Sequence, residues 1–220
     1  MNKFLFITLI LFSAVNAQTG QNLELDQSNE LTIPKENQIK IEIKMGVENE
    51  DLQTYFDFDN IMQSKFKISG ATVKNKAFVI KLKEFKDGNL SKTETLFDEG
   101  NNKYFKTDST TISFKLLTQI GKKNLKTWIR GKSFGSKKSY FELEDQNKDR
   151  YVTKDFIGGK EYLIENINKP FYLLAIITPY ITESGAGQYC QVAYSGMNPE
   201  KFGEKFNIPH YFLIQMEFVD

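Results

Sequence analysis

Thiol and imidazole groups are scarce in this 220-residue chain, which contains one cysteine, Cys190, and one histidine, His210. A single cysteine cannot form a disulfide within the chain, so the core must hold the fold together. Structural zinc needs about four Cys or His ligands, and catalytic zinc usually needs two or three histidines. The inventory therefore excludes both kinds of zinc site.

The same two residues make up the one thiol–imidazole pair available for nucleophilic catalysis. Both lie in alternating segments, where Cys190 shares a face with Val192 and His210 shares a face with Phe212. Both side chains are expected to point toward the core, where burial raises the pKa of a thiol and makes it unreactive. A buried cysteine and a hydrogen-bonded histidine at a strand end are therefore favoured over a Cys190–His210 dyad, and no catalytic residue is assigned.

Apolar runs of membrane-spanning length, about 20 residues, are also missing. The run over residues 171–181 reaches roughly half of that length and contains Pro179. No transmembrane segment is predicted.

The first residues, MNKFLFITLILFSAVNA, place one positive charge before an apolar run and end in small residues. This order is typical of a secretory signal peptide. We expect a signal peptide over residues 1–17, a polar segment over residues 18–30 and a single β-rich domain over residues 31–220, with a division into two domains near residues 131–139 as the alternative. The protein is therefore predicted to be secreted or periplasmic.

Net charge is close to zero, with 29 basic and 28 acidic residues, but the charges are segregated along the chain. Residues 45–63 contain five acids and no base, whereas residues 109–141 contain eight bases and no acid. A neutral, exported chain without a recognisable nucleic-acid motif argues against a nucleic-acid partner. The two segments are expected either to form a binding surface or to neutralise each other within the fold.

Period-two alternation of apolar and polar residues recurs along the chain and predicts half-buried strands. Clear examples are QIKIEIKM (38–45), AFVIKLKEF (77–85), TISFKLL (111–117) and NLKTWIR (124–130). KSYFELE, EYLIENI, FYLLAIITPYI, GQYCQVAYS and HYFLIQMEFV complete the set of strand candidates. Turn signals separate them, so the sequence predicts a mostly-β fold, a single antiparallel β-sandwich-like domain of about nine or ten strands.

Evidence for helices is confined to two stretches. Residues 49–63 carry apolar side chains near helical spacing, and NPEKFGEKF (198–206) begins with Asn198 as a possible N-cap and Pro199 at the first helical position. One or two short helices are expected.

A basic and aromatic surface follows from the strand predicted over residues 124–132. Alternation sends Leu125, Thr127 and Ile129 inward, and leaves a set of outward residues that includes the single tryptophan. That set is Lys126, Trp128, Arg130 and Lys132. An indole ring can stack on a sugar and cations can pair with phosphate, sulfate or carboxylate, so these four residues are the predicted ligand-binding site. An anionic glycan, a lipid headgroup or an acidic protein partner would suit it. The alternative is an edge strand that lysines protect from aggregation, with Trp128 covering a neighbouring loop.

Acceptor oxygens at every second position mark a possible metal site at Asp145, Asn147 and Asp149. The stretch fails as an EF-hand loop, because Arg150 stands where glycine is needed and Phe156 stands where a bidentate glutamate is needed. The flanking segments also indicate strands instead of helices. A polar hairpin turn is favoured, with weak Ca²⁺ binding as the alternative and no other cofactor expected.

Taken together, the residues favour an exported, non-enzymatic binding or interaction protein. The alternative is a secreted hydrolase-type enzyme that uses distant carboxylates or the Cys190–His210 dyad. An inhibitor or immunity protein that neutralises an exported toxin is a further alternative.

Overall fold

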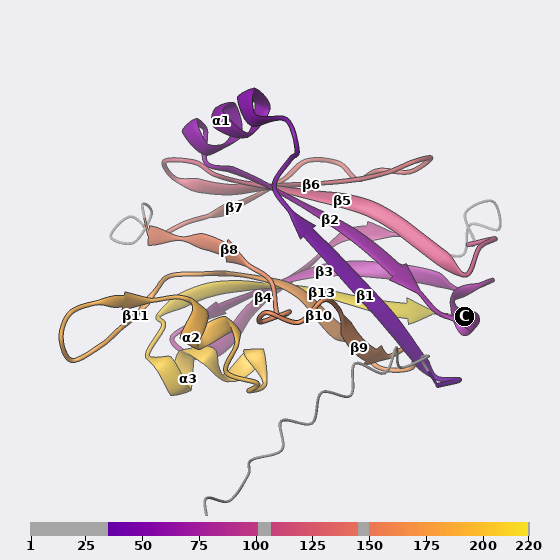
Figure 1. Cartoon of the computed structure of the whole chain (residues 1–220). Coiled ribbons are helices and arrows are strands. Elements are labelled where there is room, and N and C mark those ends of the chain that lie inside the picture. Colours follow the sequence, from indigo (N-terminus) through magenta and orange to yellow (C-terminus); the bar gives the residue numbers. More distant parts are fainter. Residues whose placement is uncertain (1–34, 101–106, 145–149, 220) are drawn as a thin grey trace, which may run out of the picture. The chain divides into compact units, whose positions relative to one another are not determined.

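The computed structural model describes residues 35–100, 107–144 and 150–219, and within them it contains thirteen strands and three short α-helices (Figure 1). The strands are β1 (Gln38–Met45), β2 (Ile61–Ser69), β3 (Ala77–Lys86), β4 (Asn89–Asp98), β5 (Thr111–Ile120), β6 (Asn124–Gly131), β7 (Ser139–Glu142), β8 (Val152–Lys154), β9 (Leu163–Asn166), β10 (Phe171–Ile177), β11 (Tyr180–Ile181), β12 (Gly187–Gln188) and β13 (His210–Val219). The helices are α1 (Glu50–Phe58), α2 (Cys190–Ala193) and α3 (Phe202–Phe206), with 3₁₀ turns η1 (Ala71–Val73) and η3 (Pro199–Lys201).

Two antiparallel sheets make up most of this structure. A six-stranded sheet, sheet A, has the order β7-β6-β5-β2-β1-β9, and a five-stranded sheet, sheet B, has the order β4-β3-β13-β10-β8. Strands β11 and β12 form a separate pair. The prediction of a mostly-β, sandwich-like fold is confirmed.

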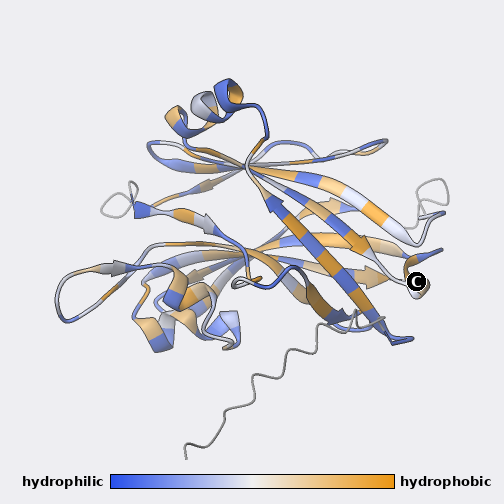
Figure 2. Cartoon of the chain, viewed as in Figure 1, coloured by the Kyte–Doolittle hydropathy of each residue, from blue (hydrophilic) through white to orange (hydrophobic). Residues whose placement is uncertain are grey.

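The main core lies between the inward faces of the two sheets and is rich in phenylalanine. Phe66 and Phe114 of sheet A stack with their ring centroids 5.0 Å apart, and Phe78 of sheet B stacks on Phe114 at 6.1 Å. Alternation drives this packing, as the regular change of blue and orange along β1 in Figure 2 illustrates. Ile39 and Ile41 of β1 are fully buried, while Lys40 between them stays partly exposed.

A second core covers the other face of sheet B. Phe202, Val192 and Ile208 come from the helical segment near the C-terminus and pack against strand residues such as Tyr211 and Leu213. Buried on both faces, β10 and β13 have nearly continuous apolar sequences instead of alternating ones. The helices α2 and α3 lie on this side of sheet B in Figure 1.

Among the described residues, sheet A has no comparable second cover. In the described ranges, α1 is the one α-helix on its outer side, and it connects β1 to β2 near their ends (Figure 1). This helix buries none of its own residues, and Phe58 at its C-terminal end is 89% exposed. We call the side of sheet A that faces away from sheet B its outer face.

The two expected helical stretches are both present. Asn49 caps α1 by accepting a hydrogen bond from the backbone N–H of Leu52 at 2.8 Å. Asn198 likewise caps η3, accepting from the N–H of Glu200 at 3.1 Å, and α3 follows directly. Among the described residues no helix combines the length and apolarity needed to cross a membrane.

Some expectations were wrong. The segment GQYCQVAYS does not form one strand, because only Gly187–Gln188 is strand and Cys190–Ala193 is helix α2. The strands β2, β4 and β8 were not anticipated. The strands that flank residues 145–149 do not pair with each other, because β7 belongs to sheet A and β8 belongs to sheet B.

The aromatic core gives a direct stability prediction. Phe78 is 1% exposed and contacts four other phenylalanine rings, so Phe78→Ala should lower the free energy of unfolding by about 3–5 kcal/mol. Phe58→Ala, at an exposed position, should change it by no more than about 0.5 kcal/mol. Urea denaturation of the two variants measures both values, and equal effects would contradict the assignment of the core.

Candidate functional site

Strand β6 carries three of the four residues predicted to form a basic and aromatic surface. Leu125, Thr127 and Ile129 are at most 1% exposed and point inward. Lys126, Trp128 and Arg130 therefore lie on the outer face of sheet A, as alternation predicted. Lys132 follows the end of β6 and is exposed, so the strand does not fix its direction.

Strand register builds a larger basic feature than the sequence suggested. Lys44 of β1 stands opposite Lys65 of β2, Lys65 stands opposite Lys115 of β5, and Lys115 stands opposite Arg130 of β6. These four residues, here named the basic row, cross four neighbouring strands on the outer face. Of these four residues only Arg130 was among the predicted site residues, and Lys44, Lys65 and Lys115 were not.

Acidic residues balance this row only at one end. Lys44 pairs with Glu48 at 2.6 Å, and this hydrogen bond, together with the charge of Lys65, lowers the pKa of Glu48. Lys65, Lys115 and Arg130 have no ion pair with any described residue. Like charges directly opposite each other destabilise a sheet, so the row is a local cost to the fold.

A neighbouring group on the same face shows the ordinary arrangement. Glu42 accepts from Lys40 at 3.3 Å and from Lys67 at 3.2 Å, so one carboxylate serves two ammonium groups. Burial raises the pKa of Glu42, but the two lysines outweigh burial and hold it below its usual value. The lack of paired acids is thus specific to the basic row, because lysines elsewhere on the outer face do pair with a glutamate.

Trp128 contacts two cations, Arg130 of the basic row and Lys138 of the following loop. Its indole N–H donates to the backbone carbonyl of Ser136 at 3.2 Å. The Arg130 guanidinium carbon lies 5.2 Å from the ring centroid, and the Lys138 ammonium nitrogen lies 5.5 Å from it. Cation–π attraction at these distances orients both cations, so the ring acts as a support for them. The Trp128 ring lies on the outer face, as expected for a binding surface, and it also contacts the following loop, as expected for a ring that covers a loop.

The acidic segment 45–63 does not neutralise the basic segment 109–141 through ion pairs. Of its acids, Glu48 pairs with Lys44, Asp57 accepts from Gln53 at 2.7 Å, and Asp59 accepts from Gln119 at 2.6 Å. No described acid of segment 45–63 forms an ion pair with a base of segment 109–141.

The single histidine belongs to a buried polar chain. His210 is fully buried at the start of β13, and its Nε2 lies 3.0 Å from Oε1 of Glu84. Its Nδ1 lies 2.5 Å from the Tyr151 hydroxyl. Burial raises the pKa of Glu84, yet hydrogen bonds from Lys86 and His210 keep it below its usual value. A hydrogen-bonded histidine at a strand end, as the sequence predicted, is confirmed.

The Cys190–His210 dyad is not assembled in this structure. Both ring nitrogens of His210 are occupied by Tyr151 and Glu84. Cys190 is exposed at the start of α2, with its sulfur 3.7 Å from the Lys154 ammonium nitrogen. The expectation that Cys190 is buried was therefore wrong, because the segment forms a short helix and only Val192 and Ala193 face the core.

Three pockets lined by described residues lack the carboxylate pair that a glycosidase needs. These three pockets each contain one carboxylate, which is Glu165, Asp59 or Asp57. The calcium prediction at Asp145, Asn147 and Asp149 falls outside the described residues. Within the described part, no group of three His, Cys, Asp or Glu side chains is placed to hold a metal ion.

The basic row also makes a stability prediction. Lys115 lies between Lys65 and Arg130, so Lys115→Gln removes two like-charge contacts and should raise the free energy of unfolding by about 0.5 kcal/mol at low salt. The gain should shrink in about 1 M salt, where screening is strong. Lys122→Gln, on the exposed turn after β5, is the matched control and should have no such effect. Chemical denaturation at two salt concentrations tests this, and destabilisation by Lys115→Gln at low salt would contradict it.

Comparison with known proteins adds no relative that could identify this surface. No protein-family model, curated protein or solved structure matches the chain. The function must therefore be inferred from the geometry of the outer face itself.

Proposed function

We propose that this is a non-enzymatic binding protein that holds an acidic polysaccharide on the outer face of sheet A. The observation that carries the proposal is the basic row, in which three of four aligned cations form no ion pair with a described residue. An anionic ligand would supply the missing charge. It would also remove the repulsion between neighbouring strands.

The spacing of the row favours a polymer over a single small anion. Neighbouring strands lie about 4.8 Å apart, so the four cations span roughly 14 Å with one charge on each strand. Lys126 on the outer face and Lys138 above Trp128 widen the positive area beyond the row. A chain whose sulfate or carboxylate groups repeat along its length would contact several of these cations at once, and a lone phosphate would contact few.

The chemistry of the face favours a hydrated glycan over an acidic protein. Protein interfaces are depleted in lysine at their centres and enriched in aromatic and apolar residues. Lys65 and Lys115 occupy the centre of this face, and Trp128 contacts the neighbouring cations Arg130 and Lys138. Exposed hydrated cations suit a ligand that stays hydrated when bound.

An anionic membrane is also less favoured. Tyr140 of β7 is exposed opposite Lys126, and two further exposed aromatic residues near this face, Tyr55 and Phe58, are on α1, which carries Glu50, Asp51 and Asp57. Those carboxylates would be repelled by anionic headgroups. An extracellular polysaccharide also agrees with the compartment expected from the predicted signal peptide over residues 1–17.

Dextran sulfate and unsulfated dextran provide a matched pair of probes. The purified protein should bind dextran sulfate and not dextran, and binding should weaken as salt is raised from about 0.05 to 0.5 M. The double variant Lys65→Gln/Lys115→Gln should bind roughly three- to tenfold more weakly, since each exposed ion pair contributes about 0.2–1 kcal/mol. Titration calorimetry at fixed salt measures the difference.

The control is Lys122→Gln/Lys123→Gln, which removes the same net charge from the exposed turn after β5. It should retain wild-type affinity for dextran sulfate. Equal losses in the two double variants would show that only net charge matters and would overturn the proposed site. Binding to vesicles with anionic lipid, but not to dextran sulfate, would contradict the glycan proposal and would indicate a membrane surface as the ligand.

A further inference from the structure

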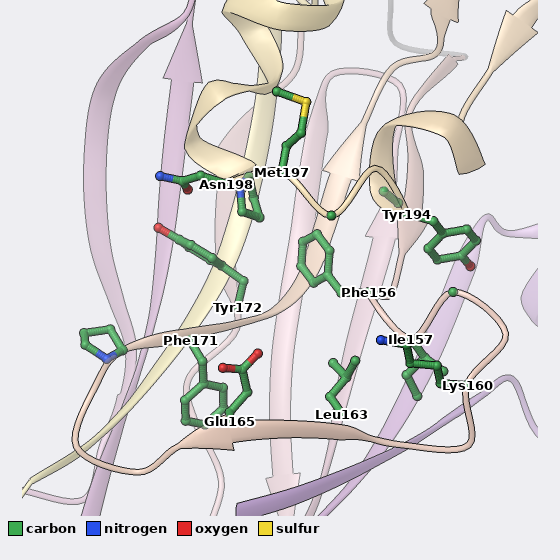
Figure 3. A pocket seen from close by; sticks show the side chains of 15 residues that line it. Phe156, Ile157, Lys160, Leu163, Glu165, Phe171, Tyr172, Tyr194, Met197 and Asn198 are labelled. Atoms are coloured by element: carbon green, nitrogen blue, oxygen red, sulfur yellow. The ribbon is translucent and has the colours of Figure 1, made fainter. Parts of the chain in front are cut away.

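A pocket of about 410 Å³ lies away from the basic row, where β9 of sheet A approaches β10 of sheet B (Figure 3). The loop after β8 and the segment after α2 complete its wall. Most of its lining is aromatic or aliphatic: Phe156, Leu163, Phe171, Tyr172, Tyr194 and Met197. Concave sites with an apolar lining and a few polar groups are typical of small-molecule binding.

Glu165 is the one carboxylate that lines this pocket. It stands opposite Ile39 in the pairing of β9 with β1, as Leu163 stands opposite Ile41. Ile39 and Ile41 are fully buried and face the core, so Leu163 and Glu165 point to the same inward side of the sheet. A glutamate therefore occupies a strand position where alternation calls for an apolar residue.

The Glu165 carboxylate has no counter-charge in the part of the chain that the structure describes. Its side chain forms no hydrogen bond or ion pair with any residue that the structure describes. Burial raises its pKa, and no neighbouring group opposes that effect. A partly buried carboxylate without a partner is uncommon, because desolvation of the charge is normally offset by a cation or a donor.

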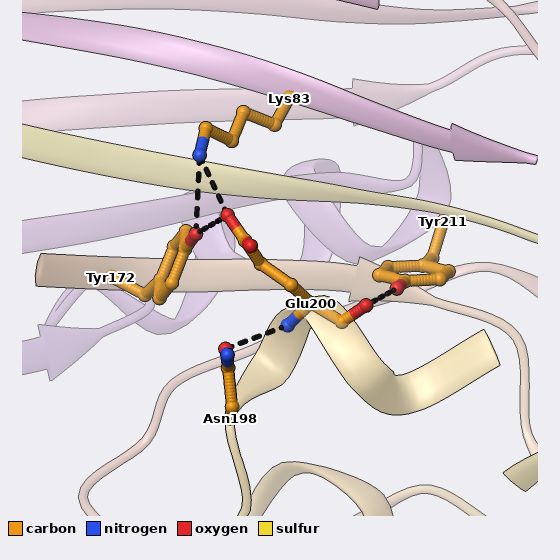
Figure 4. A network of polar contacts seen from close by, with 5 residues as sticks. All are labelled: Lys83, Tyr172, Asn198, Glu200 and Tyr211. Carbon is orange, nitrogen blue, oxygen red and sulfur yellow. Dashed lines mark hydrogen bonds and ion pairs between the residues drawn. The ribbon is translucent and has the colours of Figure 1, made fainter. Parts of the chain in front are cut away.

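Lys83, whose ammonium nitrogen lies 3.4 Å from the hydroxyl of the pocket residue Tyr172, is already paired with another acid. Lys83 pairs with Glu200 at 2.6 Å, and the Tyr172 hydroxyl donates a hydrogen bond to the same carboxylate (Figure 4). The Tyr211 hydroxyl donates to the backbone carbonyl of Glu200 at 2.9 Å, which fixes this acid from a second side. Tyr172 is thus anchored through its hydroxyl while its ring lines the pocket.

Lys160 is the one basic residue of the pocket lining, and it forms no ion pair with Glu165. It is exposed on the loop after Gly159, and Figure 3 places it on the opposite side of Leu163 from Glu165. No ion pair joins the two described side chains. Lys160 therefore adds a positive charge at the rim and leaves the carboxylate open to a ligand.

We propose that this pocket binds a small organic cation, with an ammonium group that pairs with Glu165 and alkyl groups that contact the surrounding aromatic rings. Aromatic faces attract cations, and carboxylates add a full opposite charge. A neutral ligand such as a sugar would leave the carboxylate uncompensated, and an anion would be repelled by it. This site and the glycan surface rest on different observations.

Choline and 3,3-dimethylbutan-1-ol provide the test, because they share size and shape and differ in the positive charge. Choline should bind roughly tenfold or more tightly than the uncharged alcohol, as expected for combined cation–π and charge pairing. Glu165→Gln should abolish that preference while leaving the thermal unfolding midpoint unchanged or raised. Titration calorimetry at low salt, with a melting curve for each variant, measures both.

Lys160→Gln is the matched second variant on the same pocket. It removes a like charge from the rim, so choline should bind about two- to threefold more tightly than to the wild-type protein. Equal binding of choline and the alcohol, no binding of either at millimolar concentration, or loss of binding in Lys160→Gln would each overturn the proposal. The wild-type probe pair and Lys160→Gln decide the question even if Glu165→Gln fails to fold.

Discussion

The central strands of sheet B, β10 and β13, are buried on both faces, and most other features of the structure depend on this constraint. One face packs on sheet A through Phe78 and its neighbours, and the other is covered by the segment that carries Val192 and Phe202. Because α2 and α3 lie on sheet B, the outer face of sheet A has no helical cover from the described residues except near α1 (Figure 1). Charge can therefore collect on that face without disturbing the core.

The same asymmetry explains how far the fold could be predicted from the sequence. β1, β5 and β6 alternate clearly because each buries one face, and all three were expected. β2 was missed because Ser64 occupies an inward position, and β4 was missed because nearly all its residues are exposed. Helix α2 was taken for a strand because four residues are too few to show a helical period.

The candidate site could be predicted only in part, and the reason is strand register. Alternation placed Lys126, Trp128 and Arg130 on one face, since that depends on a single strand. The basic row depends on β2 pairing with β5, although β3 and β4 lie between them in sequence and belong to the other sheet. Pairings of this kind follow from the whole fold, so the alignment of Lys65 with Lys115 has no local signal.

The two proposed sites differ in the free energy that their charges cost the folded protein. Like charges about 5 Å apart in water repel by about 1 kcal/mol per pair, and salt screens them further. Glu165 instead faces inward among apolar side chains, where desolvation penalises its charge and no described cation offsets the penalty. An exposed row can persist without a ligand at small cost, whereas an unpaired inward carboxylate is harder to maintain. Glu165 is therefore the stronger single indication that a ligand of opposite charge completes the structure.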